Sequence, residues 1–234
     1  MSNPPAKPPF LTAEWRDLAL ANYAVDPARL KDRVPDGVEL DLHDGLCFVS
    51  LVAFHFRNTR VRGVAIPGHV NFEEVNLRFY VRRGDRRGVV FIKEIVPKPA
   101  IAWVARTLYG EPYETWRCRR EDTDYRWEKA GREHRFAVVP STEGALPEPG
   151  SHAEFITEHY WGYTRRGPGR TDEYQVTHPQ WPHFAVNSHV IDVDFGAVYG
   201  SEWADLSQAN PHSVIFARGS EIAVYPGSRL TAHA

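Results

Sequence analysis

The sequence predicts an α+β fold in which most of the chain forms antiparallel β-strands and a few short helices lie between them. Short apolar or alternating segments recur from end to end, and turns rich in glycine, proline and aspartate separate them. Helix-capping signals are confined to three or four places. Because the strands follow one another through short turns, antiparallel pairing is favoured over alternating βαβ units.

The chain begins with a proline-rich stretch and continues into one predicted domain. Residues 1–9 contain four prolines and no apolar core, which indicates a flexible arm, and residues 10–234 are expected to form a single domain. Asp26 and Pro27 supply the cap and first turn of a short helix that ends near Val34. Around this helix we expect a strand at 18–25, a hairpin of 38–42 with 46–56, and a loop at 58–70.

The stretch from Val75 to Val96 predicts two paired strands joined by a hairpin loop at 83–88, with glycines that supply positive φ. If the hairpin is centred on Asp85, then Tyr80 lies opposite Val90, Arg78 opposite Ile92 and Asn76 opposite Glu94, all on one face. A lone buried carboxylate is costly, so this register requires a partner for Glu94, and Arg78 is the first choice. A shift of the centre by half a residue would separate the two side chains.

A short helix is predicted to follow the hairpin, over residues 100–108. Pro97 and Pro99 prevent further ladder pairing, and Gly110 ends the helix. Pro112 disfavours the α conformation at Glu111, so the chain leaves the helix extended. A helix of about nine residues rises only about 14 Å, so its exit stays near the sheet. We therefore expect Arg106, Glu111 and Tyr113 to border one cavity together with Arg78 or Glu94.

The remaining chain predicts more strands and two more helical regions. Ser151 and Glu154 fit a capping box for a helix that reaches about His159, and residues 141–150 are the best linker candidate. Residues 194–206 are expected to form one or two short helices. The predicted strands are 114–120, 125–129, 135–139, 160–164 paired with 174–177, 184–193, and a terminal hairpin of 213–217 with 221–225.

Composition and charge exclude several partner classes. Lys and Arg number 28 against 30 Asp and Glu, so no basic field points to nucleic acid. No apolar run approaches the roughly 20 residues that cross a bilayer, and no secretion signal is recognised, so we expect a cytoplasmic protein without a membrane partner. His178 and His183 lack the cysteines or further histidines of a zinc motif, so no metal and no cofactor are expected. A small-molecule ligand is the expected partner, and a homo-oligomer remains open.

Several motifs resemble those of the YqjF-like family of bacterial proteins of unknown function. They are F-L-T-A-E-W-R near the start, the stretch 70–113, E-H-Y-W-G-Y-T, Y-Q-V-T-H-P-Q-W and A-R-G-S. More distantly, P-A-I-A followed by Arg106 and Pro112 is similar to the acetoacetate decarboxylase-like superfamily, where a comparable helix leads into Pro-Lys-Lys with the Schiff-base lysine. Tyr113 stands at that position here, so the resemblance implies a barrel with a pocket but no imine chemistry.

The candidate site follows from these residues. We expect Glu94, Glu111 and Tyr113 to be catalytic, and Arg78, Arg106 and Asn76 to bind substrate. In this interpretation the pocket binds a small organic acid or ketone, and the chemistry is non-covalent acid–base or lyase-like. The alternative is an ion-pair network that only closes the barrel, in a non-catalytic ligand-sensing or interaction module. Lys98 precedes the helix between two prolines and is interpreted as a surface or helix-start residue.

Overall fold

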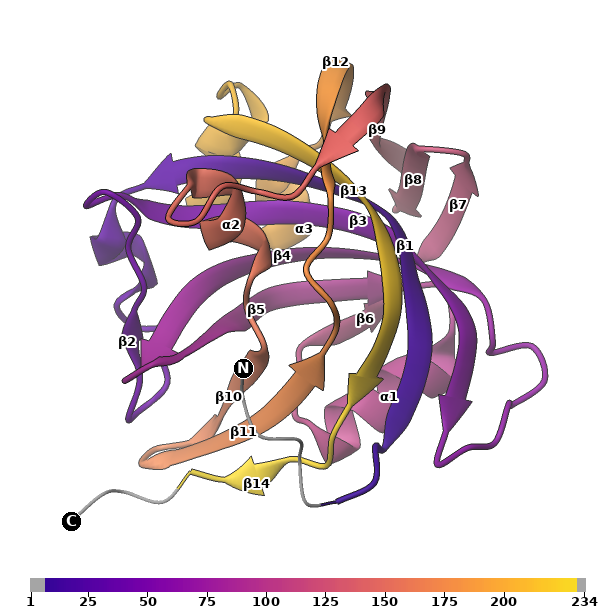
Figure 1. Ribbon diagram of the computed structural model, residues 1–234, viewed down its shortest axis with the longest axis vertical. Coiled ribbons are helices and arrows are strands. Elements are labelled where there is room, and N and C mark those ends of the chain that lie inside the picture. Colours follow the sequence, from indigo (N-terminus) through magenta and orange to yellow (C-terminus); the bar gives the residue numbers. More distant parts are fainter. Residues whose placement is uncertain (1–6, 231–234) are drawn as a thin grey trace.

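The computed structural model describes residues 7–230, and its secondary structure is dominated by strands (Figure 1). The strands are β1 (Leu11–Val25), β2 (Glu39–Leu40), β3 (Cys47–Val61), β4 (Phe72–Arg83), β5 (Arg86–Val96), β6 (Tyr113–Thr115), β7 (Arg117–Glu121), β8 (Asp124–Lys129), β9 (Arg132–Ala145), β10 (Trp161–Gly167), β11 (Arg170–Thr177), β12 (His183–Asp192), β13 (Ser213–Val224) and β14 (Ser228–Arg229). The helices are η1 (Pro27–Leu30), α1 (Pro99–Leu108), α2 (His152–Thr157), α3 (Phe195–Tyr199) and η2 (Ser201–Ser207).

Seven strands form a closed ring of hydrogen-bonded neighbours. The order is β11, β10, β5, β4, β3, β1 and β13, and β13 returns to β11 through Val176 opposite Val224. Strands β12, β9, β8 and β7 continue outward from β13. All neighbours are antiparallel except β10 and β6, which both run parallel to β5. The predicted mostly antiparallel α+β class is therefore confirmed.

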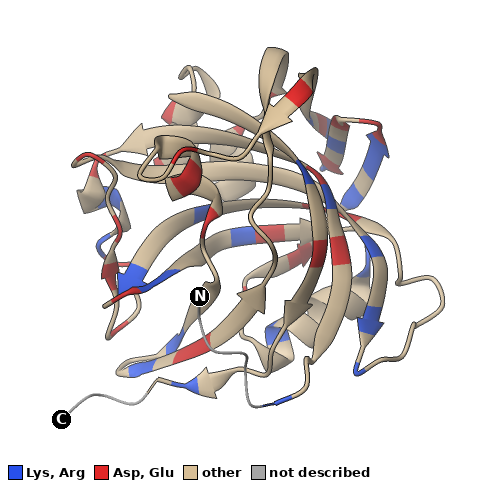
Figure 2. Ribbon diagram, viewed as in Figure 1, with Lys and Arg blue, Asp and Glu red and all other residues tan. Residues whose placement is uncertain are grey.

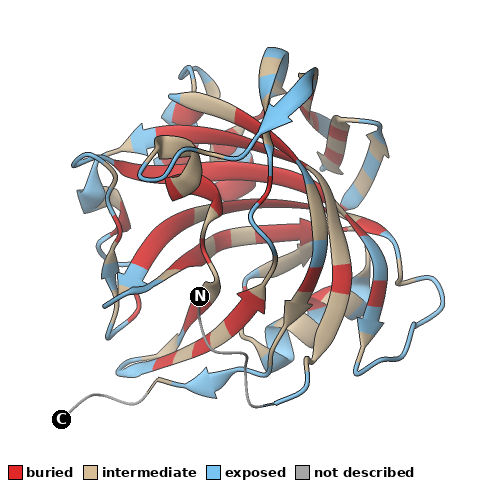
Figure 3. Ribbon diagram, in the orientation of Figure 1, coloured by how far each residue is buried: buried red, intermediate tan, exposed pale blue. Residues whose placement is uncertain are grey.

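The central strands are buried along much of their length (Figure 3). Their apolar residues form two cores, one on each face. Val75, Leu77 and Phe79 of β4 belong to one core, which α3, η2, β8 and β9 cover. Phe72 and Tyr80 belong to the second core, which also contains residues of α1 and α2. Because side chains alternate along β4, Glu74, Asn76 and Arg78 lie on the face of the second core. The cavity described below lies on the same face.

Two predicted hairpins are wrong. Segment 38–42 does not pair with 46–56, because β2 pairs with β4 and β3 lies between β1 and β4. The terminal hairpin is instead one continuous strand, β13, whose partner along its length is β1. Gly219, expected in a turn, lies within β13 opposite Arg16 of β1, with φ +73°. A Cβ there would lie 2.0 Å from the Trp15 carbonyl oxygen, so glycine permits close approach of two strands rather than a reversal.

The structure has helical residues at each predicted place, although the first helix is a 3-10 helix, η1, that ends at Leu30 and not near Val34. The Asp26 carboxylate accepts from the Ala28 backbone N–H, the Ser151 hydroxyl accepts from that of Glu154, and Asp194 accepts from that of Ala197. The predicted linker at 141–150 is partly strand, since β9 extends to Ala145. Most of the predicted arm at 1–9 lies outside the described residues. Among the helices described, none is both long and apolar enough to cross a membrane.

Charged residues of both signs are interspersed over the strands and loops (Figure 2). Most of them form ion pairs at the surface, such as Arg82 with Glu39 and Arg29 with Asp205. Exposed pairs of this kind contribute little to stability, about 0–1 kcal/mol each.

Candidate functional site

The β4–β5 hairpin has the predicted pairing at its inner end and a different one near its turn. Asn76 lies opposite Glu94, as expected, but an irregularity after Leu77 places Arg78 opposite Phe91 and Tyr80 opposite Val89. The turn is tight, with Arg83 opposite Arg86. Between the turn and the pair of Asn76 with Glu94, β5 contains one residue more than β4, and this extra residue causes the irregularity. Glu94 is 2% exposed, so its predicted burial is confirmed. Its first-choice partner is wrong, because no hydrogen bond or ion pair among the described residues joins Arg78 to Glu94; the polar group beside Glu94 is the hydroxyl of Tyr113.

A cavity of about 210 Å³ lies beside this hairpin. Its walls are predominantly apolar and aromatic, and α1 contributes Ile101, Val104 and Ala105 to them. The helix that was predicted to pack against the sheet therefore covers one side of the cavity, which is the type of concave, largely apolar site that small ligands occupy. The aromatic lining residues are Phe10, Trp15, Phe54, Phe56, Phe72, Phe91, Tyr109, Tyr113, Trp161, Tyr174 and Trp181.

Three glutamates from three segments meet at one part of the cavity. Glu74 comes from β4, Glu94 from β5, and Glu111 from the extended link between α1 and β6. Glu94 and Glu111 are brought together because β6 runs parallel to β5, with Tyr113 opposite Glu94. Glu74 and Glu111 are as buried as Glu94, at 2% and 4% exposure.

Hydroxyl and amide groups satisfy Glu74 and Glu111. The Tyr113 hydroxyl donates to Oε2 of Glu74 at 2.9 Å, and Nδ2 of Asn76 donates to Oε1 at 3.0 Å. The Thr164 hydroxyl donates to Oε1 of Glu111 at 2.6 Å. No lysine or arginine forms an ion pair with these two carboxylates in the part of the chain that the structure describes, so each glutamate depends on neutral donors.

Burial raises the pKa of all three carboxyl groups, against the weaker effects of the Arg78 charge on Glu74 and of the Arg166 charge on Glu111. It raises the pKa of Glu74 and of Glu111 to about 7, against hydrogen bonds that favour the ionised form. The pKa of Glu94 rises well above its ordinary value, first through burial and then through the nearby charges of Glu111 and Glu74. Near neutral pH, Glu74 and Glu111 therefore exchange their protons, and the direction of the shift at Glu94 favours its protonated form.

The other side of the cavity carries one arginine and two neutral histidines. Arg78 is half-buried; its Nη2 donates to the Ile156 carbonyl at 3.4 Å, while its Nε has no partner among the described residues. Burial lowers the pKa of His159 and of His178 to about 4, so both rings are uncharged at neutral pH. Among the described residues that line the cavity, Arg78 is the only lysine or arginine.

Five of the six predicted site residues line this one cavity. They are Asn76, Arg78, Glu94, Glu111 and Tyr113. Arg106 is the exception: it lies on the exposed face of α1, because residues 101, 104 and 105 turn the opposite face toward the cavity. Lys98 is the N-cap residue of α1 and does not line the cavity, as its interpretation as a helix-start residue implies.

Sequence reasoning missed other polar residues of the cavity. Glu74 precedes Asn76 and Arg78 at the period of two that defines one strand face, so alternation alone could have assigned it. His159 and Tyr174 carry no such signal. They reach the cavity because β10 pairs with β5 and β11 pairs with β13. These pairings join segments that are far apart in the chain, so a local residue pattern does not predict them.

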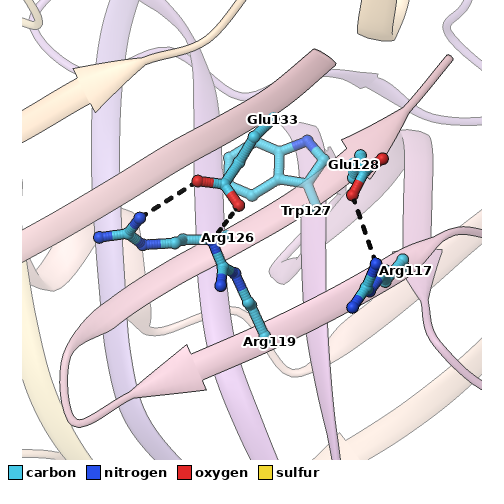
Figure 4. Close-up of a pocket in the computed structure, with 6 residues that line it drawn as sticks. All are labelled: Arg117, Arg119, Arg126, Trp127, Glu128 and Glu133. Carbon is cyan, nitrogen blue, oxygen red and sulfur yellow. Dashed lines mark hydrogen bonds and ion pairs between the residues drawn. The ribbon is translucent and has the colours of Figure 1, made fainter. Parts of the chain in front are cut away.

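A second depression, of about 190 Å³, lies on the β7, β8 and β9 strands (Figure 4). Its arginines face glutamates rather than open space: Arg126 pairs with Glu133 at 3.1 Å, and Arg119 also pairs with Glu133. Arg117 lies 3.9 Å from Glu128. Because these charges neutralise one another at an exposed surface, the depression offers no free charged group to a ligand.

Sequence relatives of the chain are uncharacterized proteins. A model of the DUF2071 family, described as an uncharacterized conserved protein, matches residues 12–221. The uncharacterized protein YqjF of Bacillus subtilis (strain 168) is 34% identical over 100 residues, which cover 42% of this chain and 41% of YqjF. The match thus spans about two fifths of the length of that relative. The resemblance to YqjF-like proteins is confirmed.

Solved structures with a similar fold are acetoacetate decarboxylases and related enzymes. The acetoacetate decarboxylase of Legionella pneumophila has a TM-score of 0.68 at 12% identity, over 96% of this chain and 88% of its own. MppR, an enduracididine biosynthesis enzyme in complex with pyruvate, has a TM-score of 0.70 at 14% identity, over 98% and 93%. An acetoacetate decarboxylase-like enzyme from Sphingomonas wittichii RW1 reaches 0.58 at 16% identity, over 97% and 95%. At these identities the likeness shows a shared fold alone.

Proposed function

Since the chain belongs to the DUF2071 family and has the acetoacetate decarboxylase-like fold, we propose that its cavity binds a small organic acid or ketone. The observation that carries this proposal is Arg78, whose Nε is buried without a partner among the described residues, on the wall of a largely apolar cavity in which it is the only described lysine or arginine. A carboxylate or carbonyl oxygen of a ligand supplies the missing acceptor. A related fold in complex with pyruvate supports the same ligand class.

We further propose that the glutamates move protons on the bound ligand. A protonated Glu94 donates a hydrogen bond to a carbonyl oxygen and stabilises negative charge that develops there. Glu74 and Glu111 have pKa values of about 7, which suits removal and return of a proton at the carbon next to that carbonyl. Tyr113 orients Glu74 through its hydroxyl. The reaction class is enolisation or a lyase-like step without a covalent intermediate.

Isothermal titration calorimetry tests the binding proposal directly. We expect levulinate, acetoacetate or pyruvate to bind to the purified protein at pH 7. Propanol, which is apolar but lacks both carbonyl and carboxylate, is the control and should not bind. Absence of heat with all three acids at millimolar concentration would remove the proposal. Proton NMR of bound levulinate in D2O then separates the two functional classes: enhanced exchange of its C3 protons indicates catalysis, and unchanged exchange indicates a ligand-sensing module.

No covalent imine is expected with any of these ketones. The position of the Schiff-base lysine is occupied by Tyr113, and no lysine of the described chain lines the cavity. Lys93, the nearest lysine in sequence to Glu94, instead pairs with Glu114 at 2.8 Å and donates to the Val198 carbonyl, both away from the cavity. Incubation with acetoacetate or acetone followed by borohydride should therefore leave the protein mass unchanged. A reduced adduct mapped to any lysine by peptide mass spectrometry would restore imine chemistry.

A further inference from the structure

The charged groups of the cavity are divided between its two ends. Glu74 and Arg78 lie four residues apart on one face of β4, which separates their Cα atoms by about 13 Å along an extended strand. Glu94 and Glu111 join Glu74 at its end, whereas the half-buried Arg78 approaches the segment at 156–159. The cavity therefore presents three carboxyl groups at one end and one guanidinium at the other.

Two buried acceptors at the carboxyl end lack a hydrogen-bond donor. Oε2 of Glu94 and Oδ1 of Asn76 are both buried and have no partner among the described residues. These two residues are direct neighbours across the β4–β5 ladder, so both unpaired acceptors belong to the same small region. A proton on Glu94 can satisfy one of them, but when Glu94 is ionised the region needs a further donor, which an incoming ligand can supply.

A ligand cation supplies that donor better than a neutral group does. An ammonium has three N–H donors and no acceptor, which matches two unpaired oxygens next to a carboxylate. The aromatic rings of Tyr113 and Tyr174 lie at the same end, and the negative faces of such rings attract cations. A metal ion fits less well, because no group of three or more His, Cys, Asp or Glu within residues 7–230 is arranged to hold one.

We propose that the ligand carries an ammonium or similar cationic group bound by Glu94, Glu74 and Asn76, while Arg78 holds its carboxylate or carbonyl oxygen at the other end. This inference rests on the proposed function, since it gives the ligand proposed to bind Arg78 a second set of contacts at the glutamates. The ligand class is a small amino-substituted oxo acid. Its size is limited by the cavity, whose volume is about 210 Å³.

Binding of a cation at this end is coupled to proton release. The titratable groups that face Glu94 are Glu74 of β4, Glu111, Tyr113 of β6 and Tyr174 of β11, while the charge of Arg78 reaches Glu74 and that of Arg166 reaches Glu111. Neither arginine forms an ion pair with these glutamates among the described residues, so an ammonium bound directly to them favours their ionised forms more strongly. Affinity for a cationic ligand should consequently increase from pH 5.5 to pH 7.5, whereas affinity for an uncharged analogue should not.

A matched pair of ligands tests the inference. Levulinate and 5-aminolevulinate share the carboxylate and the ketone and differ by one amino group, so calorimetry at pH 7 isolates that group. We expect 5-aminolevulinate to bind about tenfold more tightly or better, as one charge-assisted hydrogen bond implies. In Glu94→Gln the preference, taken as the ratio of the two affinities, should fall to near one; the contact of Glu94 with the ketone is common to both ligands and cancels in this ratio, and the melting temperature reports whether the variant is folded. The exposed Glu148→Gln serves as the matched control and should retain the preference.

The outcomes separate the two proposals. If neither ligand binds, the proposed function is wrong and the inference falls with it. If levulinate binds and 5-aminolevulinate binds no more tightly, the proposed function stands and the inference is overturned. A preference that persists in both Glu94→Gln and Glu74→Gln would also overturn it, because the glutamates would not be its source. Loss of the preference in those variants alone supports the inference.

Discussion

Replacing Arg78 with methionine is expected to weaken binding of levulinate by about ten- to one hundredfold, the equivalent of about 1.5–3 kcal/mol for a hydrogen bond to a charged group. Methionine preserves much of the aliphatic volume, so the walls of the cavity stay packed. Since Arg78 is the only lysine or arginine among the described lining residues, no other side chain replaces its charge. Calorimetric titration of both proteins at the same pH measures the ratio of dissociation constants.

Arg82→Met is the control for this change. Arg82 belongs to the same strand and pairs with the exposed Glu39 at 3.0 Å, outside the cavity. We expect it to bind levulinate as the unmodified protein does. Equal affinities for Arg78→Met and the unmodified protein would show that the carboxylate lies elsewhere. The histidine side, His159 and His178, would then be the next candidate, because both line the same cavity.

The sequence was sufficient to predict the strand-rich fold class and much of the candidate site, for an identifiable physical reason. Side-chain alternation is a local property, so the residue pattern of β4 and β5 is enough by itself to assign Asn76, Arg78 and Glu94 to one face. The short helix with its proline and glycine boundaries likewise limited how far Glu111 and Tyr113 could lie from β5.

Non-local pairing explains what the sequence did not reveal. A tight turn and a compensating irregularity in β5 separated Arg78 from Glu94, and alternation cannot detect one inserted residue. The Gly219 region reads as a turn, yet β13 remains extended because β1 pairs with it on both sides of the glycine. Arg106 was assigned to the cavity without knowledge of which helical face the sheet would cover. Each error concerns a contact between segments far apart in the chain.

The buried glutamates also make stability depend on pH in a defined direction. Burial raises the pKa of Glu111 from 4.5 to about 7, so between these values the folded state binds more protons than the unfolded state. Stability therefore falls as pH rises through this range and stays at the lower level above pH 7. Histidines oppose this trend: burial lowers the pKa of His159 and His178 to about 4, so their contribution to stability rises between pH 4 and pH 6.5. Comparing the unmodified protein with a Glu111 variant at each pH removes the histidine contribution, because both proteins contain the same histidines.

We accordingly expect the stability of Glu111→Gln, measured relative to that of the unmodified protein, to increase from acidic to alkaline pH. A pKa change from 4.5 to about 7 corresponds to a change of roughly 2–3 kcal/mol in the stability difference between pH 5 and pH 8, since each pKa unit is worth about 1.4 kcal/mol. The amide oxygen can still accept from the Thr164 hydroxyl that now donates to Glu111. The charge of Glu111 also raises the pKa of Glu94, so its removal acts in the same direction.

Urea unfolding at pH 5, 6, 7 and 8 measures this difference in stability, with the exposed Glu148→Gln as the control that should show no such trend. A difference that is constant across this range would mean that Glu111 is ionised throughout, and the proposed proton transfer by this residue would have to be abandoned.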